Sequence, residues 1–192
     1  MEIKLKYDTP KEWANQVLEN LDEFLQDHAD AERKVSTMCM SIIAKYPDRT
    51  EIIDELTQTA VEELLHFKQV YKIMQKRGLS LDGVFKKDRY LKGIMPHIKT
   101  SRDGRFLDRL ILASIAEMRG VERFKLVSEA AEDEEIKKFY GNLYKQEFAH
   151  VNSFIEMGMK YFPEEEVEKR LNELLVVEAE VIEKLPWMPA IH

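Results

Sequence analysis

The amino-acid sequence predicts an all-α protein: a four-helix bundle with one long crossover connection and an additional C-terminal helix. Only seven Gly and six Pro occur in 192 residues, which is too few for a turn-dense β fold. Long segments instead repeat apolar residues with the 3.6-residue period of a helix face. The length and the 44% share of hydrophobic residues suit one domain, residues 1–192, with a sizeable core.

Five long helices are expected, at about residues 10–45, 48–77, 105–130, 132–161 and 163–185. The first begins with Thr9 as N-cap and Pro10 at the first helical position, and Gly78 ends the second as a C-cap. The crossover, residues 78–104, is long enough at ~3.3 Å per residue to run the length of a bundle. A short helix near residues 88–92 is compatible with its sequence. This order of helices predicts the one-crossover topology of ferritin-like bundles.

The chemically informative feature is a Glu-x-x-His spacing that occurs twice, at Glu63 and His66 and again at Glu147 and His150. Residues three apart on a helix project from one face, so each pair can offer a carboxylate and an imidazole to one metal ion. Glu62 is turned ~100° from Glu63 and is expected to face outward or sideways.

A further Glu precedes each motif at nearly the same distance. Glu32 lies 31 residues before Glu63, and Glu117 lies 30 residues before Glu147. In an antiparallel helix pair both legs to and from the turn are then ~22 Å long, so the two carboxylates of each pair reach one height. Four carboxylates and two imidazoles at one level inside a four-helix bundle form the ligand set of a di-iron or di-manganese centre. The predicted metal ligands are Glu32, Glu63, His66, Glu117, Glu147 and His150.

Other side chains near these positions are open to more than one interpretation. His28, one turn before Glu32, is expected as a neighbour of the ligands or a core residue rather than a direct ligand. Glu122 is the rival of Glu117, but it is turned ~140° round the helix and breaks the spacing symmetry. Tyr140 is expected as a packed core residue, with a contact to the ligand carboxylates as the alternative.

The charge is unevenly distributed. Residues 68–109 contain twelve Lys or Arg and four Asp, a net charge of +8 in a chain of −7, so the remainder carries −15. A solvated helix end and loop is one explanation, and an electrostatic footprint for a polyanion such as RNA is the other. The candidate phosphate contacts are Lys72, Lys76, Arg77, Lys86, Lys87, Arg89 and Lys92.

Composition also excludes several classes of protein and of metal site. No apolar run approaches the ~18 residues of a membrane span, and no apolar signal region follows the charged start, so we expect a cytoplasmic protein without membrane association. The single cysteine, Cys39, excludes an internal disulfide and a cysteine-based zinc or iron–sulfur site, and it is expected in the core. Oxygen and nitrogen donors remain for any metal.

The sequence segments around the predicted ligands resemble those of the MiaE-type tRNA hydroxylases. The runs that carry the resemblance stand in the same order and at similar spacing, from about residue 13 to residue 183: DHADAERKVST, EELLHFKQVYKIMQKRGL, LDRLILASIAEMRGVERFKL and FYGNLYKQEFAHVNSFI. Two departures are visible. The stretch EMRGVERF replaces the family's frequent EARSCERF, and the C-terminus keeps only His192 of an expected basic, His-ending tail.

The resemblance implies a non-haem di-iron monooxygenase. The six predicted ligands would then bind two iron ions. With O₂ as cosubstrate, this centre would hydroxylate the isopentenyl side chain of a hypermodified adenosine beside the anticodon of tRNA. The sequence has no flavin, haem or iron–sulfur motif, so a separate reductase or ferredoxin is expected to supply electrons. The partner of the basic segment would then be tRNA.

Two rivals use the same residues. A rubrerythrin-like oxidase or peroxidase acting on a small molecule or peroxide would have the same ligands, but such proteins usually carry a Cys₄ module or a further ligand Glu, and neither is evident. A metal-free helical bundle with buried Glu–His pairs is the third interpretation. The loaded metal, Fe or Mn, and the oligomeric state are not specified by the sequence.

Overall fold

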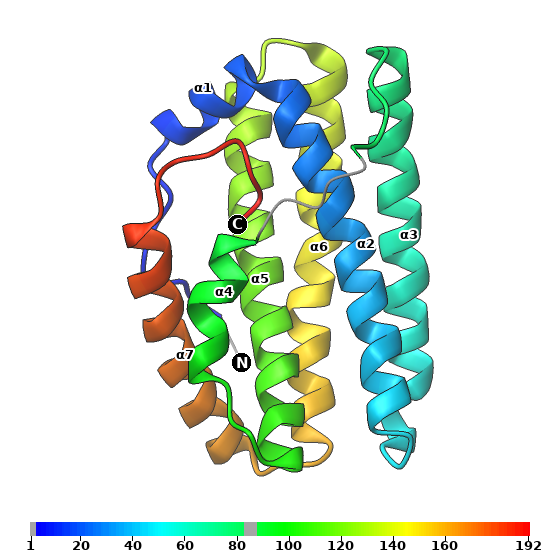
Figure 1. The fold of residues 1–192 in the computed structure, drawn as a ribbon, viewed down its shortest axis with the longest axis vertical. Coiled ribbons are helices and arrows are strands. Elements are labelled where there is room, and N and C mark those ends of the chain that lie inside the picture. Colours follow the sequence, from blue (N-terminus) through cyan, green and yellow to red (C-terminus); the bar gives the residue numbers. More distant parts are fainter. Residues whose placement is uncertain (1–2, 83–87) are drawn as a thin grey trace. The chain divides into compact units, whose positions relative to one another are not determined.

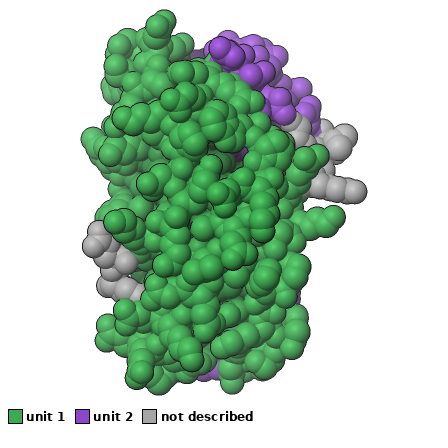
Figure 2. Space-filling model, turned by 90° about the vertical axis from the view of Figure 1, so that its left-hand side faces the viewer, with its two compact units in different colours: residues 1–18, 88–188, 192 green, residues 19–87, 189–191 purple. Residues whose placement is uncertain are grey.

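The structure, a computed structural model, describes residues 3–82 and 88–192. Within these ranges the chain forms seven α-helices, two short 3₁₀ helices and no strand, so the all-α prediction is confirmed. The chain divides into two compact units (Figure 2). Unit 1 comprises residues 1–18, 88–188 and 192, and unit 2 comprises residues 19–87 and 189–191. Among the described residues, no helix has both the length and the apolar character needed to cross a membrane.

Unit 2 is built on an antiparallel helix pair (Figure 1). Helix α2, Leu21–Lys45, is followed by the 3₁₀ helix η1, Thr50–Ile52, and by α3, Ile53–Lys76. Each helix buries one apolar stripe and exposes the other face. The Ser36 hydroxyl of α2 donates a hydrogen bond to the Ala60 carbonyl of α3 at 2.9 Å, which fixes the register of the pair. Gly78 follows α3 with φ 74°, the left-handed conformation of a helix C-cap glycine.

The prediction of one continuous helix from residue 10 to residue 45 is wrong. The chain leaves the helical conformation at Asn20 (φ −123°, ψ 40°), and a separate helix, α1, covers Glu12–Glu19. The physical reason is that α1 buries Trp13 and its neighbours within unit 1, whereas α2 belongs to unit 2. Thr9 is not the N-cap either, because α1 begins only at Glu12; its hydroxyl instead donates a hydrogen bond to the carboxylate of Glu122.

Unit 1 is built on a second antiparallel pair, α5 (Arg102–Ala130) and α6 (Glu134–Met159), to which α7 (Glu164–Lys184) is added (Figure 1). Asp133 caps α6 by accepting hydrogen bonds from the backbone amides of Glu135 and Ile136. The short helix near residues 88–92 is confirmed as α4, Arg89–Ile94, which continues into the 3₁₀ helix η2, Met95–His97. The predicted ends of the three long helices of this unit lie within three residues of the observed ones.

A buried ion pair joins α5 to α7 within unit 1. The guanidinium of Arg119 donates to both carboxylate oxygens of Glu178, at 2.9 Å and 3.1 Å, and both side chains are fully buried. Arg119 also donates to the Thr9 hydroxyl and to Glu122. The Tyr90 hydroxyl of α4 lies 3.4 Å from Glu178. This network ties the N-terminal segment, α4 and α7 to α5.

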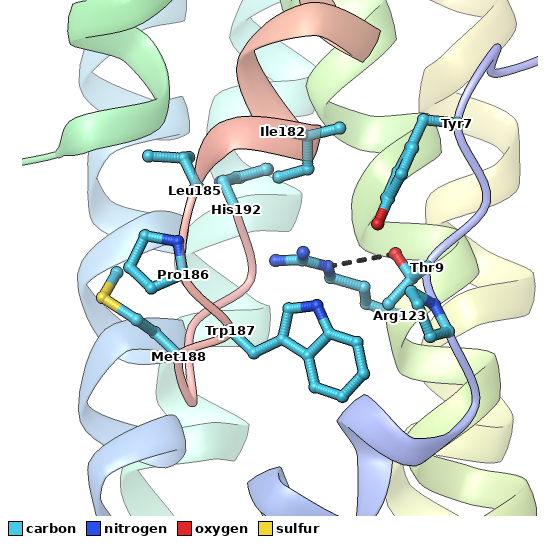
Figure 3. A pocket seen from close by; sticks show the side chains of 10 residues that line it. Tyr7, Thr9, Arg123, Ile182, Leu185, Pro186, Trp187, Met188 and His192 are labelled. Carbon is cyan, nitrogen blue, oxygen red and sulfur yellow. Dashed lines mark hydrogen bonds between the residues drawn. The ribbon is translucent and has the colours of Figure 1, made fainter.

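Residues 185–188 follow α7 and line a pocket within the same unit (Figure 3). The Trp13 indole donates to the Met188 carbonyl at 3.0 Å. The pocket is small, and the Arg123 side chain points into it with its Nε 3.4 Å from the Thr9 hydroxyl oxygen. Burial, together with the nearby charge of Arg119, lowers the pKa of Arg123 to about 10.

Candidate metal centre

Unit 2 contains a first set of possible metal ligands. Glu32 lies in the middle of α2, and Glu63 and His66 lie three residues apart on α3. One ligand atom from each of these residues lies within 4.8 Å of the other two. The Nδ1 atom of His66 is 3.9 Å from Glu32 Oε2 and 3.6 Å from Glu63 Oε2. All three side chains are buried, Glu63 with an exposure of 1%. We call this set the α2–α3 half-site.

His28 is in direct contact with this half-site. Its Nε2 atom lies 2.5 Å from Glu32 Oε1, and the imidazole is fully buried one helical turn before Glu32. The sequence suggested a neighbour of the ligands or a core residue, and the geometry is that of a neighbour that fixes one oxygen of the carboxylate. Groups that hold a ligand in this way orient it and tune its basicity.

Unit 1 contains a second set with the same composition. Glu117 lies on α5, and Glu147 and His150 lie on α6. One ligand atom from each again lies within 4.8 Å of the others. The Nδ1 atom of His150 is 2.8 Å from Glu147 Oε2, and all three side chains are buried. We call this set the α5–α6 half-site.

Glu122 and Glu62, the two carboxylates that were not chosen as ligands, have other partners in the structure. Glu122 accepts hydrogen bonds from the backbone amide of Thr9 at 2.8 Å and from its hydroxyl at 2.6 Å, and it pairs with Arg119. Glu62 accepts a hydrogen bond from Gln58 on the outer part of α3. Neither belongs to a group of possible ligands among the described residues.

Tyr140 and Cys39, which are near predicted ligands in the sequence, are core residues. Tyr140 is fully buried, and its ring packs edge-on against Phe139 and tilted against Phe124. Cys39 is buried on α2. Packing of this kind is what the sequence suggested for both residues.

The donor chemistry of the half-sites suits iron or manganese. Each set offers two carboxylates and one imidazole from buried positions. A buried carboxylate is costly unless it is paired, protonated or bound to a metal. Carboxylates favour hard divalent ions, and imidazole adds affinity for iron. The residues present therefore fit a redox-active metal.

The predicted phosphate contacts lie in both units. Lys72, Lys76 and Arg77 are exposed at the C-terminal end of α3, where Arg77 also forms an ion pair with Asp22 at 2.7 Å. Arg89 and Lys92 are exposed on α4 in unit 1. The predicted contacts Lys86 and Lys87 lie outside the residues that the structure describes.

The ion pair of Arg119 with Glu178 was not among the features predicted from the sequence. A signal was present, because Glu178 follows Leu171, Leu174 and Leu175 at helical spacing on the inner face of α7. A carboxylate on an apolar stripe requires a buried partner. Its partner comes from another helix, however, and the sequence does not specify which one.

An all-helical chain with these two donor sets has the fold and the chemistry of the ferritin-like di-iron class. Comparison with known proteins makes the assignment more specific. Residues 2–192 match the family model of tRNA-(MS2IO6A)-hydroxylase (MiaE), and the chain belongs to this family.

Individual relatives agree with the family assignment. A tRNA 2-(methylsulfanyl)-N(6)-isopentenyladenosine(37) hydroxylase from Pseudomonas putida is 29% identical over 175 residues, which cover 91% of this chain and 84% of the relative. The hydroxylase of the same name from Salmonella typhimurium is 29% identical over 132 residues, covering 69% of this chain and 48% of that protein.

A solved structure supports the fold. Protein 43 with aldehyde deformylating oxygenase activity from Synechococcus superposes with a TM-score of 0.91 at 27% identity. The match covers 97% of this chain and 93% of the other.

Proposed function

We propose that the two half-sites bind two iron ions and that the protein hydroxylates the isopentenyl side chain of a hypermodified adenosine next to the anticodon of tRNA. The observation that carries the proposal is the repeated half-site: two carboxylates and one imidazole, with ligand atoms within 4.8 Å, in each unit. The proposed iron ligands are Glu32, Glu63, His66, Glu117, Glu147 and His150. Membership of the MiaE family supports the substrate.

The bound iron would supply the activation of O₂: one oxygen atom enters a C–H bond, the other leaves as water, and two electrons and two protons are consumed. The protein's own residues have distinct parts in this scheme. The carboxylates neutralise the metal charge, and His28 holds one oxygen of Glu32. Val121 and Phe154 are buried one helical turn after Glu117 and His150, respectively, and would provide apolar surroundings that limit access of water to the α5–α6 half-site. Leu25 is buried on α2, two turns before Glu32.

Electrons and substrate come from outside the chain in this proposal. Because no cofactor motif for electron transfer occurs in the sequence, we infer a separate reductase or ferredoxin as donor. Exposed lysine and arginine side chains, among them Lys72 and Lys76, would bind the tRNA phosphates, and this binding should weaken as salt is raised. With a substrate of this kind, we expect the protein to act in the cytoplasm.

The decisive experiment compares tRNA nucleosides by mass spectrometry. A strain that lacks the gene should lose the hydroxylated adenosine and accumulate its unhydroxylated precursor, and the wild-type gene should reverse both changes. A gene encoding Glu147→Gln should not, whereas Glu62→Gln, a carboxylate outside both half-sites, should restore hydroxylation fully. Unchanged hydroxylated adenosine in the deletion strain would contradict the tRNA assignment.

A second candidate is oxygenation of a small molecule at the same iron site. The similarity to the Synechococcus protein with aldehyde deformylating oxygenase activity favours it. Incubation of the iron-loaded protein with an aldehyde, O₂ and a reducing system would test it. Formate release that Glu147→Gln abolishes, combined with unchanged tRNA nucleosides in the deletion strain, would favour this activity over the tRNA reaction.

A further inference from the structure

Unit 2 carries a stack of two aromatic rings and a guanidinium group beside its half-site. The rings of Phe67 and Tyr71, one turn apart on α3, are nearly parallel, with an interplanar angle of 10° and 5.9 Å between centroids. The guanidinium carbon of Arg33 on α2 lies 5.6 Å from the centroid of the Phe67 ring. Asp30, one turn earlier on α2, forms an ion pair with Arg33 and so restrains the guanidinium group. We call Arg33, Phe67 and Tyr71 the stacking triad.

The triad lies at the level of the α2–α3 half-site. Arg33 directly follows Glu32 on α2, and Phe67 directly follows His66 on α3. Because one helical step turns a side chain by ~100°, both residues project to the side of the helix rather than along the direction of the ligands. Phe67 and Tyr71 are half-buried, and the Arg33 side chain is 32% exposed, so the triad is accessible to solvent while the ligands are buried.

A structural role explains only part of this arrangement. An aromatic pair four residues apart supports an isolated helix by a few tenths of a kcal/mol, and this accounts for Phe67 and Tyr71. It does not require a guanidinium group from a second helix at the face of the ring. Aromatic rings together with an arginine plane are, in contrast, the surface on which proteins stack the unpaired bases of RNA.

The charge next to the triad favours a polyanion. From Lys68 to Arg77, α3 and its C-cap carry four basic and no acidic residues. Lys68 and Lys72 are exposed on the stripe of α3 next to Tyr71. An acidic protein would satisfy the same charges, but it would make no use of the parallel ring faces.

We propose that Arg33, Phe67 and Tyr71 form a stacking platform for unpaired nucleotides of the RNA substrate that flank the modified adenosine. The proposal rests on the proposed tRNA function and adds the residues that position the RNA. The platform holds the neighbouring bases on the outside of unit 2, at the height of the half-site, while Lys68 and Lys72 bind the adjoining phosphates. The three residues are positioning residues, since none of them is a proposed metal ligand.

The test measures binding of an RNA hairpin with the sequence of the anticodon stem-loop, carrying the modified adenosine and a fluorescent 2-aminopurine beside it. The iron-loaded wild-type protein should bind it and change the 2-aminopurine emission through stacking. Phe67→Ala should weaken binding roughly 5- to 150-fold, the effect of losing one base–aromatic stack. Phe67→Trp should restore affinity and emission change, whereas Phe67→Leu, which keeps apolar bulk without a ring, should restore neither.

Two further variants separate the platform from general effects. Arg33→Lys keeps the charge but loses the guanidinium plane, so it should also weaken binding. Phe148→Ala removes an exposed aromatic side chain that directly follows Glu147 on α6, and it should bind like the wild type. Helix content by circular dichroism and iron content should match the wild type in all variants that are compared.

The outcomes distinguish the two proposals. A wild-type protein that does not bind the hairpin would contradict the tRNA function and the platform together. A wild-type protein that binds, with unchanged affinity and emission in Phe67→Ala, Phe67→Leu and Arg33→Lys, would overturn the platform and leave the tRNA function standing.

Discussion

The Glu63→Gln substitution tests the metal centre through protein stability, without any assay of activity. Glu63 is 1% exposed, and one of its ligand atoms lies within 4.8 Å of those of Glu32 and His66. An amide is nearly the same size as a carboxylate, so the change removes the charge and most of the metal affinity but little of the packing. We expect the variant to fold and to lose the stabilisation that iron provides at the α2–α3 half-site.

The magnitude follows from linkage. Free Fe²⁺ at 100 times its Kd raises the free energy of unfolding by about 2.7 kcal/mol when it binds only the folded state. A chain of this length gains about 2–4 °C in Tm per kcal/mol, so the wild type should gain about 5–11 °C on anaerobic addition of Fe²⁺. This gain is that of one occupied half-site. Glu63→Gln should lose it, while the intact α5–α6 half-site keeps its own contribution. Without metal we expect no loss of Tm in the variant. It no longer buries the charge of this carboxylate, so its Tm should equal or exceed that of the wild type.

Glu62→Gln is the matched control for this experiment. Glu62 is the preceding residue on the same helix, and it accepts a hydrogen bond from Gln58 rather than facing the half-site. This variant should keep the full gain in Tm on addition of Fe²⁺. A Glu63→Gln protein that gains as much as the wild type would refute the ligand assignment at this position, and a wild type that gains nothing would refute tight iron binding.

Three other expectations concern groups around the half-sites and in the core of unit 1. Arg119→Met leaves the buried Glu178 without its ion-pair partner, so unfolding by urea should show a loss of about 3–5 kcal/mol in the free energy of unfolding; a loss under 1 kcal/mol would contradict the assigned ion pair. His28→Ala releases one oxygen of Glu32 and should lower Fe²⁺ affinity about 10- to 100-fold in calorimetric titration, whereas unchanged affinity would exclude an orienting role. Burial and the charge of Glu178 raise the pKa of Tyr90 well above its ordinary value of 10.0. Above pH 10.0 the folded state therefore keeps a proton that the unfolded state loses, and the free energy of unfolding should fall as the pH rises further. Tyr90→Phe should remove this part of the pH dependence, and an identical dependence in both proteins would argue against the raised pKa.

Much of the fold could be predicted because helix signals are local. The 3.6-residue apolar period located the long helices, and the left-handed Gly78 ends α3 as a C-cap glycine should. The break at Asn20 could not be predicted, since no Pro or Gly marks it and the two segments differ only in the unit that buries them. The same limit applies to Thr9, whose hydroxyl is used by a carboxylate more than a hundred residues away rather than by the nearest helix.

The contents of each half-site could also be derived from spacing. Residues 31 and 30 positions apart in two antiparallel pairs return to the same height, and the structure brings Glu32 to Glu63 and Glu117 to Glu147 within each unit. The contact of His28 with Glu32 depends on side-chain rotamers inside a packed interior. The guanidinium of Arg33 over the Phe67 ring depends on how two helices pack against each other, and neither contact follows from sequence distance.

The sequence by itself determined the long helical segments, apart from the break at Asn20, the six side chains of the two donor sets, and the family. These depend on periodicity and on short motifs along the chain. Tertiary structure alone decided which partners surround each carboxylate. Glu117 and Glu122 are five residues apart on one helix, yet one lies beside Glu147 and His150, and the other is held by Thr9 and Arg119. The physical reason is that a buried carboxylate takes its role from the groups that compensate its charge, and these groups come from other parts of the chain.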